Sequence, residues 1–283
     1  MEGEKGAVCV TGGTGYVASW LIMKLLEKGY SVRATIRFNS DAECKKDISY
    51  LTNLPGASEK LSIFTADLNK PESFSEAIEG CTGVFHVAHP VDFIGKEPEE
   101  IIIKRAVEGT LGILNSCLNS KTVKRVVYTS SAATVMFKNK DQALTDESSW
   151  SDIDFYRSLN LMSTSYLVAK TKTEQAALEF AEKHGLNLVT LIPSLVVGPF
   201  ICPNIPGSVY IGLAMILGKQ ELYRVLVNSN LVHIDDLASA HIFLLEYPNA
   251  EGRYICSSNE ITIHKLSEFL SAKYPDFQIP NAE

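Results

Sequence analysis

Residues 7–18 read AVCVTGGTGYVA, and this stretch decides the fold. Its apolar beginning has the pattern of a buried strand, and the glycine-rich turn that follows opens an amphipathic helical segment. In such a turn Gly12 permits the sharp bend, Gly15 lets the backbone approach a diphosphate, and the small Ala18 allows helix and strand to pack closely. The start of the helix offers N–H groups and the positive end of its dipole to an anion. The stretch therefore predicts a dinucleotide site at Thr11, Gly12, Gly13, Thr14, Gly15, Tyr16 and Val17.

The first half of the chain alternates strand and helix patterns, as a parallel sheet with crossover helices requires. We expect an α/β fold of the Rossmann type, with a doubly wound parallel sheet, over residues 1–192. Prolines crowd the region after residue 192 and shorter elements follow, so residues 193–283 are expected to form a smaller substrate lobe. The expected strands are 7–10, 31–37, 61–66, 83–88, 123–128, 187–192 and 253–256, and the expected helices are 19–28, 71–79, 97–118, 163–184 and 237–246.

The bulk properties are those of a soluble globular enzyme, with 46% apolar residues, 21% charged residues and a net charge of −7. The absence of a block rich in lysine or arginine argues against nucleic acid or an anionic membrane as a partner. The six cysteines are scattered without metal-ligand spacing, so we expect no metal site and a reducing compartment, the cytoplasm. The sequence has no signal-peptide pattern and no segment long enough to insert into a membrane. It has no further apolar stripe that calls for a partner, so we expect a monomer.

The end of the second expected strand bears on the choice of cofactor. A site selective for NAD usually places an acid there, about 20 residues after the glycine loop, to bind the ribose 2′-hydroxyl. Here Arg37 occupies that place and the first acid after it is Asp41. A guanidinium suits the 2′-phosphate of NADP through paired, charge-assisted hydrogen bonds, so NADP(H) is the expected cofactor. Asp67, at the tip of the third strand, is a candidate for contact with the adenine.

A tyrosine and a lysine four residues apart share one face of the expected helix 163–184. A neighbouring ammonium favours the phenolate, so we expect Lys170 to lower the pKa of Tyr166 into the range of a catalytic acid or base. Ser131 follows the strand 123–128, where its hydroxyl can hydrogen-bond a substrate carbonyl and stabilise charge that develops on the oxygen. The catalytic candidates are therefore Ser131, Tyr166 and Lys170.

Several longer blocks match one family rather than a generic motif. They are residues 11–18, 66–68 (ADL), 83–88 (GVFHVA), 121–125 (KTVKR), 128–131 (YTSS), 196–200 (VVGPF), 232–237 (VHIDDL) and 252–258 (GRYICSS). On these blocks the chain resembles an extended short-chain dehydrogenase/reductase of the plant dihydroflavonol 4-reductase-like group. The resemblance runs from Val8 to about Pro280. Members of the group usually continue beyond the point where this chain stops, so the smaller lobe is expected to be shortened at its C-terminal end.

The resemblance implies a role for each catalytic candidate. Tyr166 would donate a proton to the carbonyl oxygen while NADPH delivers hydride to the carbon. Lys170 would hold the nicotinamide ribose and tune Tyr166, and Ser131 would steady the oxygen. Besides the glycine loop, the cofactor residues expected on these grounds are Arg37, Asp67, Leu68, Val87, Ala88, Thr129, Ser130, Tyr166, Lys170, Pro193 and Ser208.

Departures from the sequence motifs of the group restrict the class of substrate that we expect. Met136 stands where dihydroflavonol reductases carry an asparagine that binds B-ring hydroxyls, and a thioether offers no comparable polar contact. His89 stands where relatives show serine or threonine, and it either bonds a substrate oxygen or fills space. Residues 159–165 lack the block typical of cinnamoyl-CoA reductases, and Ala106 replaces an asparagine common in sugar-nucleotide epimerases. The expected substrate residues are His89, Val91, Phe93, Ser131, Met136, Tyr156, Met162, Phe200, Ile201, Leu213 and Asn230, with Phe137 beside them.

These observations lead to one main hypothesis and two rivals. The main hypothesis is NADPH-dependent reduction of a ketone on a plant polycyclic metabolite of the flavonoid or isoflavonoid kind, since large apolar walls suit a flat aromatic substrate. The same residues support the reverse reaction, NADP-dependent oxidation of an alcohol or hemiacetal on an alkaloid. A cofactor-binding scaffold without turnover is the rival from another class, and the intact catalytic trio argues against it.

Overall fold

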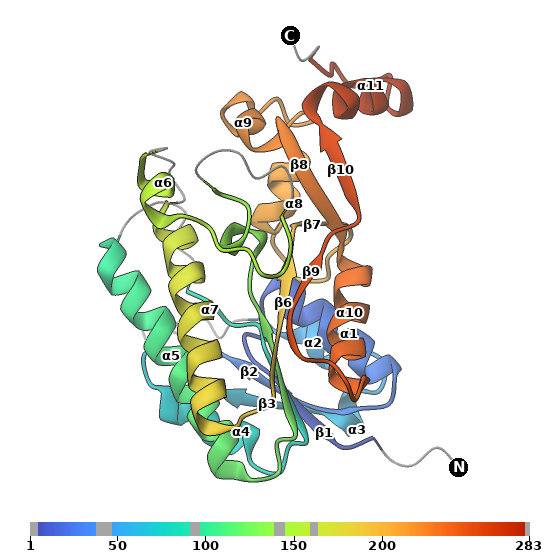
Figure 1. The fold of residues 1–283 in the computed structure, drawn as a ribbon. Coiled ribbons are helices and arrows are strands. Elements are labelled where there is room, and N and C mark those ends of the chain that lie inside the picture. Colours follow the sequence, from blue (N-terminus) through green and yellow to red (C-terminus); the bar gives the residue numbers. More distant parts are fainter. Residues whose placement is uncertain (1–4, 38–46, 91–96, 139–144, 159–163, 281–283) are drawn as a thin grey trace.

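Seven parallel strands form the main sheet, in the order β3-β2-β1-β4-β5-β6-β9 (Figure 1). The computed structural model describes residues 5–37, 47–90, 97–138, 145–158 and 164–280, and the sheet lies within them. The strands are β1 (Ala7–Val10), β2 (Ser31–Ile36), β3 (Leu61–Thr65), β4 (Gly83–His86), β5 (Arg125–Thr129), β6 (Leu188–Pro193) and β9 (Gly252–Cys256). The order reverses between β1 and β4, and open α/β sheets bind ligands at such a switch point, beyond the carboxyl ends of the strands.

Helices cover both faces of this sheet, as the predicted doubly wound fold requires (Figure 1). On one side lie α1 (Tyr16–Glu27) and α10 (Ile234–Glu246), which contact each other, with the short α2 (Ser49–Thr52) and α3 (Ala57–Lys60) nearby. On the other lie the two long helices α5 (Glu99–Ser120) and α7 (Thr164–His184), packed side by side, with η1 (Pro71–Phe74) and α4 (Ser75–Ile78). The fold class predicted from the sequence is confirmed.

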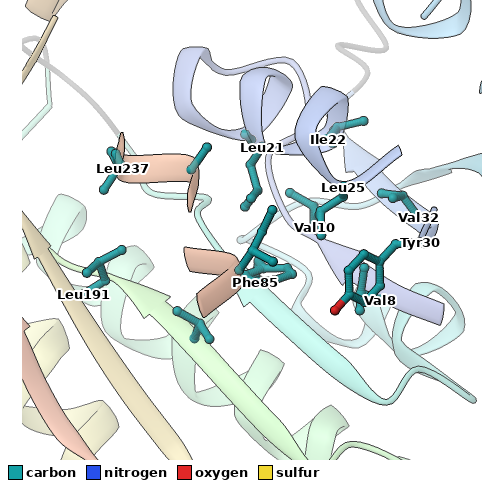
Figure 2. Close-up of a cluster of buried hydrophobic side chains, with 14 of the residues drawn as sticks. Val8, Val10, Leu21, Ile22, Leu25, Tyr30, Val32, Phe85, Leu191 and Leu237 are labelled. Atoms are coloured by element: carbon teal, nitrogen blue, oxygen red, sulfur yellow. The ribbon is translucent and has the colours of Figure 1, made fainter. Parts of the chain in front are cut away.

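Alternation along the strands distributes apolar side chains to the two layers, because successive side chains point to opposite faces of a sheet. Val8 and Val10 on β1 pack with Leu21 and Leu25 of α1 in the cluster shown in Figure 2, which also includes Leu237 of α10. Between them, Cys9 points to the opposite face and joins the cluster beneath α4, α5 and α7. The strand that carries the glycine loop is therefore buried on both sides.

A second, three-stranded sheet has the order β10-β8-β7. It is built from β7 (Leu195–Val197), β8 (Asn228–His233) and β10 (Asn259–Thr262), with β7 parallel and β10 antiparallel to β8. Around it lie α8 (Gly207–Gly212), η3 (Gln220–Leu222), α9 (Tyr223–Leu226) and α11 (Ile263–Lys273). A separate apolar cluster centred on Ala214, Met215 and Leu226 holds this part together.

The structure differs from the expected elements mainly at their ends. Helix α1 begins at Tyr16 rather than residue 19, and the expected helix 71–79 is divided into η1 and α4. The division of the chain at residue 192 stays a prediction about domains. It does not describe how the main sheet is built, because β9 pairs with β6 and α10 packs on α1, although both follow residue 192. The remaining elements are η2 (Ala132–Thr134) and α6 (Ile153–Ser158).

Candidate active site

The glycine-rich loop after β1 is held against two neighbouring strands. The Gly13 N–H donates to the carbonyl of Thr35 on β2 at 2.7 Å. Gly12 adopts φ +74°, and a Cβ atom there would lie 3.1 Å from the Cα of Ala88, just after β4. A side chain would therefore be strained by the backbone conformation and crowded by its neighbour. This close approach leaves a cradle at the switch point of the sheet.

The cradle leads directly into the first turn of α1. Gly15 is the N-cap residue of this helix and no side chain caps it. The N–H groups of a first helical turn have no partner within the helix, and they attract anions together with the helix dipole. The loop thus fits the diphosphate of a dinucleotide, as predicted from residues 11–17. Tyr16 fixes the far side of the turn, because its hydroxyl donates to the carbonyl of Gly198 at 3.2 Å.

Behind the loop, a buried histidine links β1 to β4 and α5. The Thr11 hydroxyl oxygen accepts the N–H groups of Val87 (3.1 Å) and Ala88 (3.0 Å), so its own hydrogen is free to donate to Nδ1 of His86 at 3.0 Å. Nε2 of His86 must then carry the ring proton and donate to the hydroxyl of Thr110 at 2.9 Å. Burial, and then the charge of Lys170, lowers the pKa of His86 to about 3, so the ring stays neutral.

The carboxyl end of β5 positions Lys170, the lysine predicted to take part in catalysis. The Lys170 ammonium donates to the carbonyl of Thr129 at 2.9 Å. The hydroxyl of the same threonine contacts Nε2 of His241 at 2.7 Å, and Nδ1 of His241 lies 2.8 Å from the carbonyl of Leu237. Since a carbonyl only accepts, Nδ1 carries the proton and Thr129 donates to Nε2. Helix α10 therefore supports the residue that holds Lys170.

A buried ion pair lies one turn beyond Lys170 on α7. Glu174 accepts a hydrogen bond from the hydroxyl of Ser130 and another from Nε of Arg253 on β9, the latter at 2.7 Å. Arg253 also stacks on the ring of Trp150, 3.8 Å from its centroid. Glu174 and Arg253 were not predicted, although Glu174 follows Lys170 by four residues and so shares its helix face. That spacing was the signal from which Glu174 could have been predicted.

Ser131 and Tyr166 are hydrogen-bonded and Lys170 is held at the end of β5, but one electrostatic expectation was wrong. We expected Lys170 to lower the pKa of Tyr166, whereas burial raises it and a hydrogen bond with Ser131 only partly offsets the rise. Burial also lowers the pKa of Lys170 to about 7, against the opposing charge of Glu174. Desolvation is the largest cause of both shifts, so Tyr166 holds its proton at neutral pH.

The other residues predicted to bind the cofactor are spread along the same edge of the sheet. Arg37 is exposed immediately after β2. An Asp67 carboxylate oxygen accepts the backbone N–H of Asn69 at 2.9 Å, and the side chain of Leu68 packs against Gly109 of α5. Val87 and Ala88 follow β4, Pro193 is the last residue of β6, and Ser208 lies in the first turn of α8. Their contacts with a cofactor stay predictions.

The predicted substrate residues occupy less uniform positions. His89 meets the ring of Tyr166 edge-on, with 5.5 Å between the ring centroids. Tyr156 is fully buried against Phe137, which places it in the core beneath the site. Met136 is 42% exposed, and Asn230 pairs with Glu260 in the second sheet. Phe200, Ile201 and Leu213 are half-buried, and Val91, Phe93 and Met162 lie outside the described residues.

The described residues also bear on metal binding and membrane insertion. In that part of the chain, no group of three or more histidine, cysteine, aspartate or glutamate side chains is arranged to hold a metal ion. Within the same residues, no helix has both the length and the apolar character to cross a membrane. The expectation of a monomer concerns association in solution and stays a prediction.

Comparisons with known proteins agree with this geometry. Residues 8–256 match the NAD dependent epimerase/dehydratase family. Vestitone reductase of Medicago sativa is 54% identical over 99% of this chain and 85% of its own length. Its crystal structure superposes with a TM-score of 0.86, covering 97% of this chain and 84% of that one.

Two further plant relatives are similar over 99% of this chain. Protein BRI1-5 ENHANCED 1 of Arabidopsis thaliana is 57% identical, with 78% of its length covered. Noscapine synthase SDR1 of Papaver somniferum is 52% identical, with 82% covered. These findings confirm the resemblance predicted from the motifs. The chain belongs to the NAD dependent epimerase/dehydratase family and is a nicotinamide-dependent oxidoreductase of the extended short-chain dehydrogenase/reductase kind.

Proposed function

We propose that this protein reduces a ketone on a polycyclic, flavonoid-like plant metabolite with NADPH. The observation that carries the proposal is that Ser131, Tyr166 and Lys170 meet at the carboxyl end of β5, where Ser131 bonds Tyr166 and Lys170 donates to the carbonyl of Thr129. Similarity to vestitone reductase over nearly the whole chain supports the reaction and the substrate class. The half-buried apolar side chains of Phe200 and Ile201, which the resemblance assigns to the substrate site, suit a flat aromatic substrate.

The preference for NADP(H) over NAD(H) rests on one cation. Arg37 directly follows β2, where a site selective for NAD carries an acid that binds the ribose 2′-hydroxyl. Its exposed guanidinium is available for a 2′-phosphate, to which it would bind through paired hydrogen bonds. When bound, NADPH would supply the hydride.

The remaining chemistry belongs to side chains of this protein. Tyr166 would donate its proton to the carbonyl oxygen, and its raised pKa keeps that proton in place until charge develops on the oxygen. Ser131, which bonds to Tyr166, would donate a second hydrogen bond to the same oxygen. The carbonyl of Thr129 holds Lys170 so that its ammonium faces the reacting groups with little freedom.

Oxidation of an alcohol or hemiacetal on an alkaloid is the second candidate, supported by the similarity to noscapine synthase SDR1. In that direction Tyr166 would have to accept a proton as a phenolate. Burial disfavours the phenolate, so an oxidation would require a higher pH than the reduction. The raised pKa of Tyr166 therefore favours reduction at neutral pH.

The experiment is a comparison of two tyrosine variants. Tyr166→Phe is expected to lower ketone-dependent NADPH oxidation by about 10²-fold or more, because the proton donor is lost, while fluorescence titration still detects NADPH binding. Tyr223→Phe is the matched control, since it removes another buried tyrosine hydroxyl, in the separate apolar cluster around Ala214 and Met215. Equal turnover by Tyr166→Phe and the wild type would contradict the proposal. If the protein were a scaffold without turnover, its function should be the same in Tyr166→Phe and in the wild type.

A further inference from the structure

The guanidinium of Arg253, on the edge strand β9 of the main sheet, is almost fully buried. Its Nε donates to Glu174 at 2.7 Å, and Nη2 donates to the hydroxyl of Thr134 at 3.3 Å. Nη1 donates to the carbonyls of Glu147 and Ser149, both at 2.7 Å. All three guanidinium nitrogens therefore bind protein groups, and these groups come from α7, η2 and the segment before α6.

Two of these contacts lie on either side of Ser131 in the sequence. Before it, Ser130 donates its hydroxyl to Glu174, the carboxylate that Arg253 binds. After it, the Thr134 hydroxyl donates to the carbonyl of Ser131 at 2.9 Å and accepts the bond from Arg253. One side chain thus fixes the chain both before and after Ser131.

The position of this backbone decides where the Ser131 hydroxyl points. Ser131 is the N-cap residue of η2, and its hydroxyl oxygen accepts the N–H of Ala133 at 3.2 Å. The hydrogen bond between Ser131 and Tyr166 acts to lower the pKa of the tyrosine, as a bond donated to the phenol oxygen does. Since hydrogen bonds weaken steeply as their angle falls, a shifted Ser131 would lose its aim at Tyr166.

The chemistry of the ion pair points to orientation rather than to strength. Burying two charges is a costly way to join two elements, because their desolvation offsets much of their attraction. A guanidinium offers direction instead, since its donors form a rigid planar fork. The central carbon of this fork lies 3.8 Å from the centre of the Trp150 ring, a contact that restricts it further.

We propose that Arg253 is a positioning residue for the reduction, and that it fixes the hydroxyl of Ser131. It acts from both sides, through Glu174 before Ser131 and through Thr134 after it. The inference rests on the proposed function, in which the Ser131 hydroxyl bonds the substrate oxygen. Arg253 acts on the reaction only through Ser131, so its effect on the rate should vanish where that hydroxyl is absent.

The test is a double-mutant cycle of Arg253→Lys and Ser131→Ala, in which kcat and the KM for NADPH are measured during ketone reduction. Lysine keeps the positive charge beside Glu174 but cannot reproduce the planar fork. Arg157→Lys is the matched control, because it makes the same exchange in an exposed ion pair on α6.

We expect Arg253→Lys to lower kcat about tenfold or more, with the KM for NADPH within about twofold of the wild type. In the Ser131→Ala background the same exchange should lower kcat by less than about twofold. Arg157→Lys should change neither quantity. Unchanged kcat in Arg253→Lys would overturn the inference, and so would an equal loss in both backgrounds, which indicates a general effect on the fold.

A second readout needs no turnover. Hydrogen exchange over residues 130–137 reports the N–H groups of Ala133 and Thr134, which bond the hydroxyl oxygen and the carbonyl of Ser131. Protection there should fall in Arg253→Lys, whereas Arg157→Lys and the strand β1 should keep theirs. Unchanged protection over residues 130–137, or a fall shared by β1, would overturn the inference.

The two readouts separate this inference from the proposed function. If the wild type reduces no ketone, the proposed function fails, and hydrogen exchange alone decides whether Arg253 fixes Ser131. If Arg253→Lys does not fold, Thr134→Val takes its place in both measurements, with the same outcomes. Valine keeps the shape of threonine and removes the hydroxyl that joins Arg253 to the carbonyl of Ser131.

Discussion

The two sides of the site are built in different ways. On the cofactor side, the polar groups of Thr11, His86, Thr129 and Lys170 are paired within the protein, and the glycine loop is bonded to its neighbours. On the substrate side, the nitrogens of His89 have no partner among the described residues and Met136 is 42% exposed. The difference indicates that the fold itself orders the side predicted to hold the cofactor, whereas polar groups on the predicted substrate side have no partner among the described residues.

The largest effect on this difference between the two sides is expected at the ion pair of Glu174 and Arg253, which joins α7 to β9. Glu174→Gln is expected to lower the free energy of unfolding by about 3 kcal/mol, because Arg253 would remain buried without its carboxylate. Chemical denaturation measures this. Glu108→Gln is the matched control, since Glu108 and Lys104 form an exposed pair at 4.0 Å and should contribute less than about 1 kcal/mol. Equal losses in the two variants would mean that the buried network is not what orders this side.

A smaller effect is expected at the glycine loop. Gly12→Ala should lower the free energy of unfolding by about 1–3 kcal/mol and weaken NADPH binding, since φ is +74° and Ala88 lies against the position of the new methyl group. Gly56→Ala is the control, because Gly56 has φ +78° but nothing within 4 Å of its added Cβ. Gly56→Ala should lower the free energy of unfolding through backbone strain, without any loss of NADPH affinity. The reverse ranking in NADPH titrations would refute the role given to this close approach.

The preference for NADPH over NADH should fall by about one order of magnitude when Arg37 is replaced. Arg37→Ser is expected to weaken NADPH binding about tenfold and leave NADH binding unchanged, because only NADPH carries the 2′-phosphate. Dissociation constants for both nucleotides measure the difference. Arg224→Ser, a change in the same residue type on α9, is the control. Similar losses for NADPH and NADH would show that Arg37 acts on the fold rather than on the phosphate.

The last prediction is a dependence of stability on pH. The pKa of Lys170 is about 7 in the folded protein, below its ordinary value of 10.5. Between these values the unfolded chain binds the proton more tightly, so the free energy of unfolding should rise with pH by up to about 1.4 kcal/mol per unit. Lys170→Met should lack this contribution. Parallel stability curves for the two proteins over that range would show that the lysine is not desolvated.

Much of the cofactor side could be predicted from the sequence because its signals are local. The glycine loop lies between an apolar strand and a helix, and Tyr166 and Lys170 are separated by one helical turn. The start of α1 was misplaced by three residues, since the helix begins within the glycine motif, before its apolar stripe. The expected effect of Lys170 on Tyr166 was wrong because burial, which dominates both pKa shifts, depends on packing rather than on spacing.

The rest depends on contacts between distant parts of the chain. The second sheet pairs β7 with β8 and β8 with β10 across long intervening segments, and β8 (NSNLVH) is too polar to read as a buried strand. His241 contacts Thr129 at the end of β5, and Arg253 contacts Thr134 on η2, each from a position more than a hundred residues later. No local pattern indicates such partners, although Glu174 could have been found from its spacing to Lys170.

The most direct test of the proposed reduction is a turnover assay in both directions on one substrate panel. Purified protein would be mixed with dihydroflavonols, isoflavanones and alkaloid hemiacetals, with NADPH in one series and NADP in the other, and NADPH fluorescence would be followed. The account predicts NADPH consumption with a flavonoid ketone near neutral pH. NADP reduction by an alkaloid substrate alone, with no ketone consumed, would contradict it.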